Sequence, residues 1–225
     1  MSLTKMRSEL VDFCCQGDFD SVKDLYERGG HLINTLELHR GNNSIFGIAC
    51  SSGNLDLVSW LYSKSPSVNM DEFTSACEFN RLEVAKKLLE WNPNLDLAQN
   101  DYDCFRFTCF AGSLSVAKWL YETHPEVDIL NDNDGFSFFH NLCMDGQKEV
   151  AEWILSLKPE IDIFGYDDEF IFKTAYEPFE ENLETIKWLY GLRGGFDIHA
   201  EDDRLLKYAK ESGFTELEDW IKTIG

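Results

Sequence analysis

The sequence repeats itself with a period of roughly 33 residues, and this period constrains the fold more than any other feature. A small residue, a cysteine, two variable residues and a glycine are followed, seven positions later, by Trp-Leu-Tyr. The phrase is complete around Gly53 and again around Gly112. With that glycine as the anchor, the copies fall at Gly17, Gly53, Asn80, Gly112, Gly146, Glu181 and Gly213. Such a period is typical of a chain built from stacked supersecondary units.

Columns of one residue type in the aligned copies predict two helices in each unit. A large apolar residue recurs about seven positions before the anchor: Leu10, Phe46, Phe73, Phe105, Phe139, Phe172 and Leu206. A cysteine recurs three positions before it: Cys14, Cys50, Cys77, Cys109 and Cys143. Apolar residues two, five and eight positions after the anchor share one face of a second helix. A Pro or Gly thirteen positions after the anchor then ends this helix.

A tryptophan column lies seven positions after the anchor: Trp60, Trp119, Trp153, Trp188 and Trp220. An aromatic stripe of this kind is a binding surface or part of the core. Because it recurs in register with the repeat, we interpret it as packing between the second helices of neighbouring units.

The segments between units carry turn residues. Residues 131–135 read Asn-Asp-Asn-Asp-Gly and predict a tight hairpin turn. The third copy is short, so we expect its hairpin, between Pro66 and Asp71, to be missing. The sixth copy carries about two extra residues between Glu177 and Glu181.

A unit of hairpin, helix, glycine turn and helix resembles the ankyrin repeat. Residues 134–140 read DGFSFFH, where that family has D-G-x-T-P-L-H. The Trp-Leu-Tyr form of the second helix is similar to divergent ankyrin repeats common in giant viruses of amoebae. Tetratricopeptide and HEAT units are the alternative helical solenoids, and the turns before each first helix argue against them because those units lack hairpins.

The resemblance implies an all-α fold with short β-hairpin turns, an ankyrin-like solenoid of about seven helix pairs. It covers essentially the whole chain, so we expect one ankyrin-repeat domain over residues 1–225. The expected units are residues 1–33, 34–69, 70–96, 97–128, 129–162, 163–197 and 198–225.

The charge balance limits the classes of partner. The chain has 41 acidic and 20 basic residues, a formal net charge of −21. Such a chain repels nucleic acid phosphates and anionic membranes and attracts basic proteins, so we expect neither nucleic acid nor membrane as a partner.

The chain has seven cysteines, an odd number that fits no secreted disulfide framework. We therefore expect a cytoplasmic protein with reduced thiols, in the host cytoplasm if the protein is viral.

Motifs for catalysis or cofactor binding are missing from the sequence. It contains no Gly-rich phosphate loop and no His-Glu-x-x-His motif. Residues 131–135 resemble part of a calcium loop, but the alignment on Gly135 puts Leu130 at the first ligand position and Asn141 at that of the bidentate Glu. We predict no catalytic residue, no metal site, no cofactor and no enzymatic activity.

Individual reactive residues also have structural interpretations. His140 and Cys143 suggest a metal pair or a nucleophile with its base, yet both lie in repeat columns and are interpreted as core and turn residues. Cys15 and Cys104 lie outside the repeat columns. The sequence leaves two alternatives for each of them: an exposed, reactive position or a buried one.

The resemblance implies that partners bind the hairpin tips and the exposed side of the first helices. The predicted protein-binding residues on the tips are Asp101, Tyr102, Asp134, Phe136, Tyr166, Asp167 and Asp168. Those on the first helices are Phe79, Phe107, Phe110, Met144 and Glu177. We predict a non-catalytic protein–protein interaction scaffold with a basic protein partner. The alternatives are a regulatory or substrate-adaptor subunit of an enzyme complex, such as a degradation complex, and, for Phe79 and Phe110, packing against neighbouring units.

Overall fold

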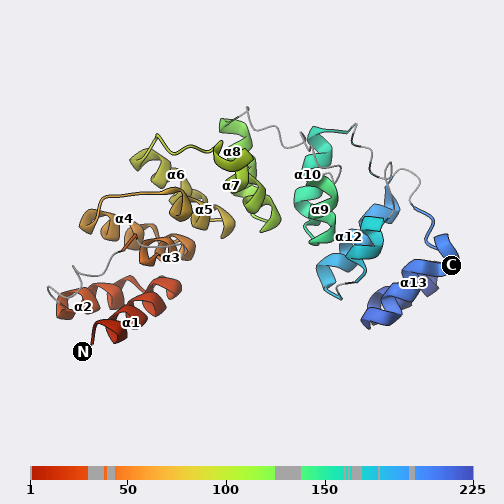
Figure 1. Cartoon of the computed structure of the whole chain (residues 1–225), viewed down its shortest axis with the longest axis horizontal. Helices are drawn as coiled ribbons and strands as arrows, with labels where there is room; N and C mark the ends of the chain where they lie inside the picture. Colours follow the sequence, from red (N-terminus) through yellow and green to blue (C-terminus); the bar gives the residue numbers. More distant parts are fainter. Residues whose placement is uncertain are drawn as a thin grey trace. The chain divides into compact units, whose positions relative to one another are not determined.

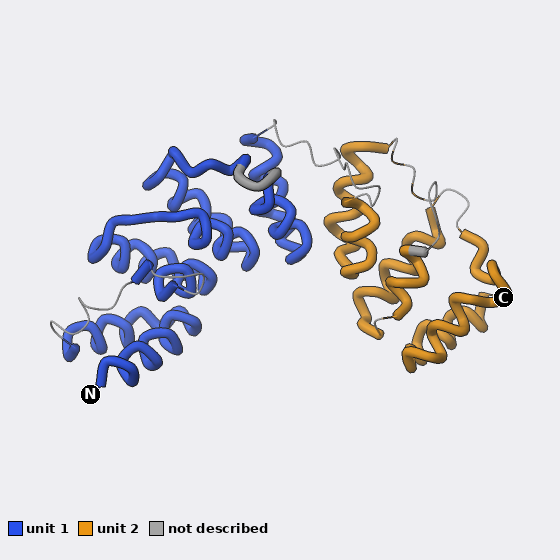
Figure 2. The backbone as a smooth tube through the Cα atoms, viewed as in Figure 1, with its two compact units in different colours: residues 1–127 blue, residues 128–225 orange. Residues whose placement is uncertain are grey.

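The computed structural model describes residues 2–29, 38–39, 44–124, 138–159, 161, 163, 169–176, 178–192 and 196–224, except for the side chains of residues 99–101 and 169. These residues form helices joined by turns and irregular segments, with no strand in the described ranges. The chain divides into two compact units, Met1–Val127 and Asp128–Gly225 (Figure 2).

The described part of unit 1 consists of four successive helix pairs (Figure 1). Its helices are α1 (Leu3–Gln16), α2 (Phe19–Gly29), α3 (Ile45–Ser52), α4 (Leu55–Lys64), α5 (Met70–Glu78), α6 (Leu82–Trp91), α7 (Gln99–Phe110) and α8 (Leu114–Thr123). The first helices α1, α3, α5 and α7 pack against one another in chain order, and so do the second helices α4, α6 and α8. This neighbour-to-neighbour packing is the arrangement of a repeat protein.

Unit 2 continues the pattern with three pairs in the described part of the chain. Its helices are α9 (Phe138–Met144), α10 (Lys148–Leu157), α11 (Glu169–Thr174), α12 (Glu180–Gly191), α13 (Ala200–Ser212) and α14 (Thr215–Ile224). Helix α11 packs against both α9 and α13, and α10 packs against α12. The predicted all-α repeat fold of about seven helix pairs is therefore confirmed. The one-domain boundaries predicted from the sequence stay a prediction.

The connections differ in part from the expected hairpins. Residues 95–97 and 196–198 lie in turn and irregular structure, not in strands. The short third connection is as expected, because residues 66–69 lead directly into α5. There Asn69 and Glu72 form a capping box, in which each side chain accepts a hydrogen bond from the other residue's backbone N–H.

The anchor residues turn the chain between the two helices of a pair. Gly17, Gly53, Gly112, Gly146, Gly213 and Asn80 all have a positive φ, between 58° and 83°. At Gly53 an added Cβ would lie 2.7 Å from the Cδ of Arg81, so a side chain there would have to displace Arg81 as well as adopt an unfavourable backbone conformation.

The predicted anchor Glu181 is wrong, because it lies inside the first turn of α12. The extra residues of the sixth copy extend that helix at its N-terminus. Glu180 and Glu181 suit this position because negative charge is favourable near a helix N-terminus.

The predicted core columns are buried. Phe46, Phe73 and Phe139 have no exposed surface, and Phe105 and Phe172 are 3% and 4% exposed. The five in-register cysteines are fully buried as well. In the last copy the buried residue is Leu205, whereas the predicted Leu206 is only half-buried.

The side chains of the tryptophan column are half-buried, and two of them, Trp60 and Trp220, pack against the neighbouring second helix as expected. Trp60 of α4 packs edge-on against Tyr26 of α2, with 5.0 Å between ring centroids. Trp220 of α14 packs in the same way against Tyr190 of α12, at 5.5 Å. The tryptophans therefore contribute to the packing between successive repeats and do not form a free aromatic surface.

Candidate protein-binding site

Helix α7 has two chemically different faces. Its buried face consists of Cys104, Phe105, Thr108 and Cys109. Asp103, Phe107 and Phe110 follow one another at spacings of four and three, so they share the other face. Phe107 is 47% exposed on that face, and Asp103 and Phe110 are half-buried.

Helix α5 repeats the same arrangement. Asp71, Ser75 and Glu78 occupy the positions of Asp103, Phe107 and Phe110 exactly one repeat earlier, 32 positions before them in the sequence. Asp71 is exposed, and Ser75 and Glu78 are half-buried. Phe79, the residue that caps α5, is 57% exposed.

The two helices form one continuous surface. α5 packs directly against α7. The turns at their ends are joined as well, because the Ser113 hydroxyl donates to the Glu78 carbonyl and the Ser115 hydroxyl to Asn80 Oδ1, each over 2.6 Å. We call this surface the α5–α7 face. It consists of Asp71, Ser75, Glu78, Phe79, Asp103, Phe107 and Phe110.

The α5–α7 face is apolar and acidic. It combines three phenylalanines with three carboxylates, and half-buried Arg106 of α7 adjoins it. Partial burial raises the pKa of Glu78 above its ordinary value. A bound cation would stabilise the charged form of this carboxylate and would therefore be attracted to it.

Three of the predicted site residues, Phe79, Phe107 and Phe110, are thus brought together on neighbouring helices. The placement of Asp101 and Tyr102 on a hairpin tip is wrong, because both lie in the first turn of α7. The chain enters this helix through a turn in which Asp96 Oδ1 accepts a hydrogen bond from the Ala98 amide. Tyr102 is half-buried and has a φ of 63°.

The other predicted site residues lie elsewhere. Met144 ends α9 in unit 2 and is half-buried. The side chain of Asp101 falls outside the part of the chain that the structure describes, as do six whole residues: Asp134, Phe136, Tyr166, Asp167, Asp168 and Glu177. These stay predictions.

Some surface residues were missed by the sequence analysis. Tyr176 and Phe179, which lie between α11 and α12, are each 58% exposed. They lie where the sixth copy departs from the repeat, so no column signals them. Asp71, Glu78 and Asp103 could have been found from the sequence. Asp103 lies on the same helix face as Phe107 and Phe110, and Asp71 and Glu78 occupy the positions of Asp103 and Phe110 one repeat earlier.

The residues considered for chemistry have structural roles. His140 is buried, its Nε2 lies 3.0 Å from the Ile163 carbonyl oxygen, and its ring stacks on Phe170 at 4.4 Å. Cys143 is fully buried, and burial raises the pKa of its thiol. The described residues contain no group of three His, Cys, Asp or Glu side chains arranged for a metal ion.

Of the two out-of-register cysteines, Cys15 is exposed and Cys104 is buried. None of the described helices is long and apolar enough to cross a membrane.

The comparisons with known proteins agree with this architecture. Residues 104–155 match the family model of ankyrin repeats (many copies). Among solved structures, the crystal structure of the human ASB11 ankyrin repeat domain is similar, with a TM-score of 0.54 and 16% sequence identity over 94% of this chain and 96% of that one. The search of curated proteins gives no match. The chain therefore has the fold of an ankyrin repeat solenoid, with residues 104–155 matching the ankyrin repeat family, and ankyrin repeats are generally modules of protein–protein interaction.

Proposed function

We propose that the protein is a non-catalytic scaffold that binds an apolar and basic segment of another protein on the α5–α7 face. The observation that carries this proposal is the exposure of Phe79 and Phe107, by 57% and 47%, on neighbouring first helices whose opposite faces are fully packed. Exposed aromatic residues grouped on adjacent elements are typical of interaction surfaces.

The aromatic residues supply the apolar part of the binding energy. Complete burial of a phenylalanine side chain contributes about 1.5–3 kcal/mol relative to leaving it in water. Phe79 and Phe107 leave about half of that contribution unused in the free protein. A partner that covers both rings therefore gains affinity without any rearrangement of the helices.

The carboxylates determine the charge of the partner. Asp71, Glu78 and Asp103 surround the phenylalanines, and the whole chain carries a formal charge of −21. A field of one sign accelerates the association of an oppositely charged partner and orients it. Lysine or arginine residues beside apolar residues fit this surface best.

The proposal extends to the predicted residues outside the α5–α7 face. We propose Met144 and the undescribed positions Asp134, Phe136, Tyr166, Asp167, Asp168 and Glu177 as further protein-binding positions, within unit 2 itself. The buried free cysteines favour a reducing compartment such as the cytoplasm.

A random peptide library displayed on phage, selected against the immobilised full-length chain, tests the proposal. We expect enrichment of peptides that combine Lys or Arg with apolar residues. The double variant Phe79→Ser/Phe107→Ser should lose the enriched peptides, whereas Phe179→Ser, which removes an equally exposed phenylalanine from unit 2, should retain them. Enrichment of acidic peptides, or retention by the double variant, would contradict the proposed face.

A further inference from the structure

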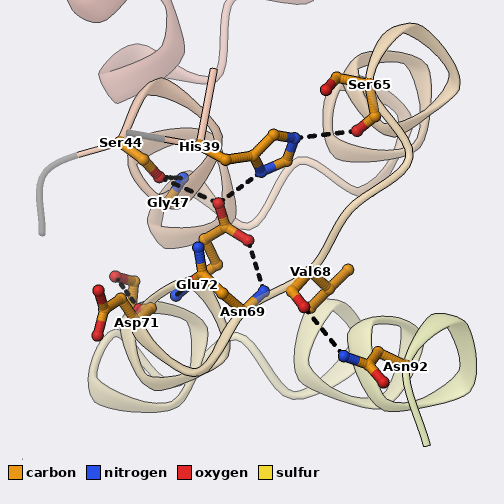
Figure 3. Close-up of polar contacts among 10 residues, drawn as sticks. His39, Ser44, Gly47, Ser65, Val68, Asn69, Asp71, Glu72 and Asn92 are labelled. Carbon is orange, nitrogen blue, oxygen red and sulfur yellow. Dashed lines mark hydrogen bonds and ion pairs between the residues drawn. The ribbon is translucent and has the colours of Figure 1, made fainter. Parts of the chain in front are cut away.

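A buried carboxylate lies where the second repeat meets the third. Glu72, in the first turn of α5, has no exposed surface. Its Oε2 accepts the Asn69 amide at 2.9 Å, and its Oε1 accepts the Ser44 hydroxyl at 3.3 Å (Figure 3). His39 Nδ1 lies 2.6 Å from the same Oε1. Glu72 is thus acceptor to three groups, as suits an ionised carboxylate.

The surroundings of His39 favour the protonated imidazolium. Nδ1 faces the Glu72 carboxylate, and Nε2 lies 2.9 Å from the Ser65 carbonyl oxygen (Figure 3). Both neighbours are acceptors, whereas a neutral imidazole has only one N–H to donate. Only the imidazolium satisfies both contacts. The ring also packs on Phe46, with 4.9 Å between centroids, and its side chain is only 16% exposed.

The ion pair joins three elements that are distant in the sequence. Leu38 and His39 belong to the connection before α3, Ser65 caps the end of α4, and Glu72 opens α5. The Leu38 carbonyl also accepts the Phe46 amide at 3.0 Å. Without the charge on His39, Nε2 or Nδ1 would face an acceptor with no proton to share, and a buried carboxylate would lose its counter-ion.

We propose that His39 and Glu72 form a pH-sensitive clasp that fastens the connection between the second and third repeats while His39 is protonated and loosens it when His39 is neutral. This inference does not depend on the proposed binding function. The described groups that face the clasp are the Ser65 carbonyl from α4, Ser44 and Phe46 at the start of α3, and the Cys50 thiol. Burial above all, and then the charge of Glu72, raise the pKa of the Cys50 thiol, so that this thiol stays neutral and adds no competing charge.

The direction of the pH dependence follows from the pKa of His39. The hydrogen bond that His39 donates to Glu72 and the charge of that carboxylate raise this pKa above the ordinary value, although partial burial opposes the shift. A pKa raised in the folded state stabilises the fold fully below the unfolded-state value of about 6.5. That stabilisation is lost as the pH rises through the folded-state pKa. The clasp therefore weakens as the pH rises above that raised pKa.

Urea unfolding of the full-length chain between about pH 6 and about pH 9 tests the clasp. The wild-type midpoint should fall with rising pH by more than that of His39→Gln. As a matched control, His199→Gln removes a half-exposed histidine whose Nδ1 also contacts a carboxylate, Asp203, and it should keep the wild-type pH dependence. Identical pH dependence in wild type and His39→Gln would overturn the proposal.

A spectroscopic titration gives a second readout that does not depend on how well the variants fold. The imidazole NMR signals of His39 in the wild-type chain should titrate at a higher pH than those of the urea-unfolded chain. A His39 midpoint equal to that of the unfolded chain would equally refute the clasp.

Discussion

The side chain of Asn54 joins two repeats through the Gly17 carbonyl. Its Nδ2 donates to that oxygen over 2.8 Å, while its Oδ1 accepts the Leu57 amide at 3.1 Å and so caps α4. Asn54 therefore caps the second helix of its own repeat and also binds the turn of the preceding repeat. The capped amide and the turn carbonyl are both groups that helix ends otherwise leave unsatisfied.

Similar links join other neighbouring turns. The Ser113 hydroxyl donates to the Glu78 carbonyl at 2.6 Å in unit 1, and the Ser212 hydroxyl donates to the Ala175 carbonyl at 3.3 Å in unit 2. Each donor lies in the turn region of one copy and each acceptor near the turn of the copy before. These bonds fix the register in which the helix pairs stack.

Asn54→Ala should destabilise the protein by about 1–2 kcal/mol, because it removes both the helix cap and the bond to Gly17. Asn54→Asp keeps the capping acceptor and removes only the donor, so its loss should be smaller. Urea unfolding of the three proteins measures the difference. Equal losses in the two variants would show that the cap contributes nothing.

Phe73→Ala and Phe79→Ala should differ greatly in their effect on stability, although Phe73 lies in α5 and Phe79 is the residue that caps it. Phe73 is fully buried, and its truncation should cost about 3–5 kcal/mol, as should that of Phe139. Phe79 is 57% exposed, so its truncation should change the free energy of unfolding by less than about 0.5 kcal/mol. Thermal unfolding followed by circular dichroism distinguishes them. A large loss for Phe79→Ala would identify that ring as core and remove it from the proposed binding face.

Gly146→Ala should destabilise unit 2. Gly146 has a φ of 70°, and an added Cβ would lie 2.5 Å from Asn182 Oδ1, whose residue is itself buried. The left-handed conformation alone costs a non-glycine residue about 1–2 kcal/mol. Gly191→Ala is the control, because nothing lies within 4 Å of its added Cβ and it ends helix α12. Denaturant titration should show a loss for the first variant and none for the second.

A bulky thiol reagent should modify one cysteine rapidly in the native protein. Cys15 is exposed, whereas the other six cysteines are buried. Burial also raises the pKa of Cys14 to about 12, so almost none of its thiol is ionised near neutral pH. Mass spectrometry of the labelled protein should find a single early adduct that Cys15→Ser abolishes. Early labelling of Cys50, Cys77 or Cys109 would mean that the first helices are not packed as described.

The helix pairs and the core were predictable because they depend on residues that recur. Phe46, Phe73 and Phe139 lie in one column, and any residue in that column faces the neighbouring unit. The same reasoning failed at Glu181, where extra residues lengthen α12, and at Leu206, where the adjacent Leu205 is buried instead. An insertion or a change of helix start alters the register locally, and a periodic pattern contains no information about it.

The candidate site and the clasp were predictable to different extents. Phe79, Phe107 and Phe110 follow from helix faces, whereas the tip position of Tyr102 failed because α7 begins earlier than the expected hairpin allows. The Asn69 and Glu72 capping box has a recognisable spacing of three residues, but no pattern pairs Glu72 with His39. That contact depends on how a non-repeating connection folds back onto the next unit.

The binding affinity of one peptide from the proposed library selection tests the central claim most directly. Fluorescence polarisation of that labelled peptide would be measured with the wild-type chain, with Phe79→Ala/Phe107→Ala and with the matched exposed-phenylalanine control Phe179→Ala. The account predicts that the double variant binds at least about tenfold more weakly, a loss of about 1.4 kcal/mol, with unchanged thermal stability, while the control binds like the wild type. Equal affinity of the double variant and the wild type, with both proteins folded, would contradict the assignment of the α5–α7 face as the binding site.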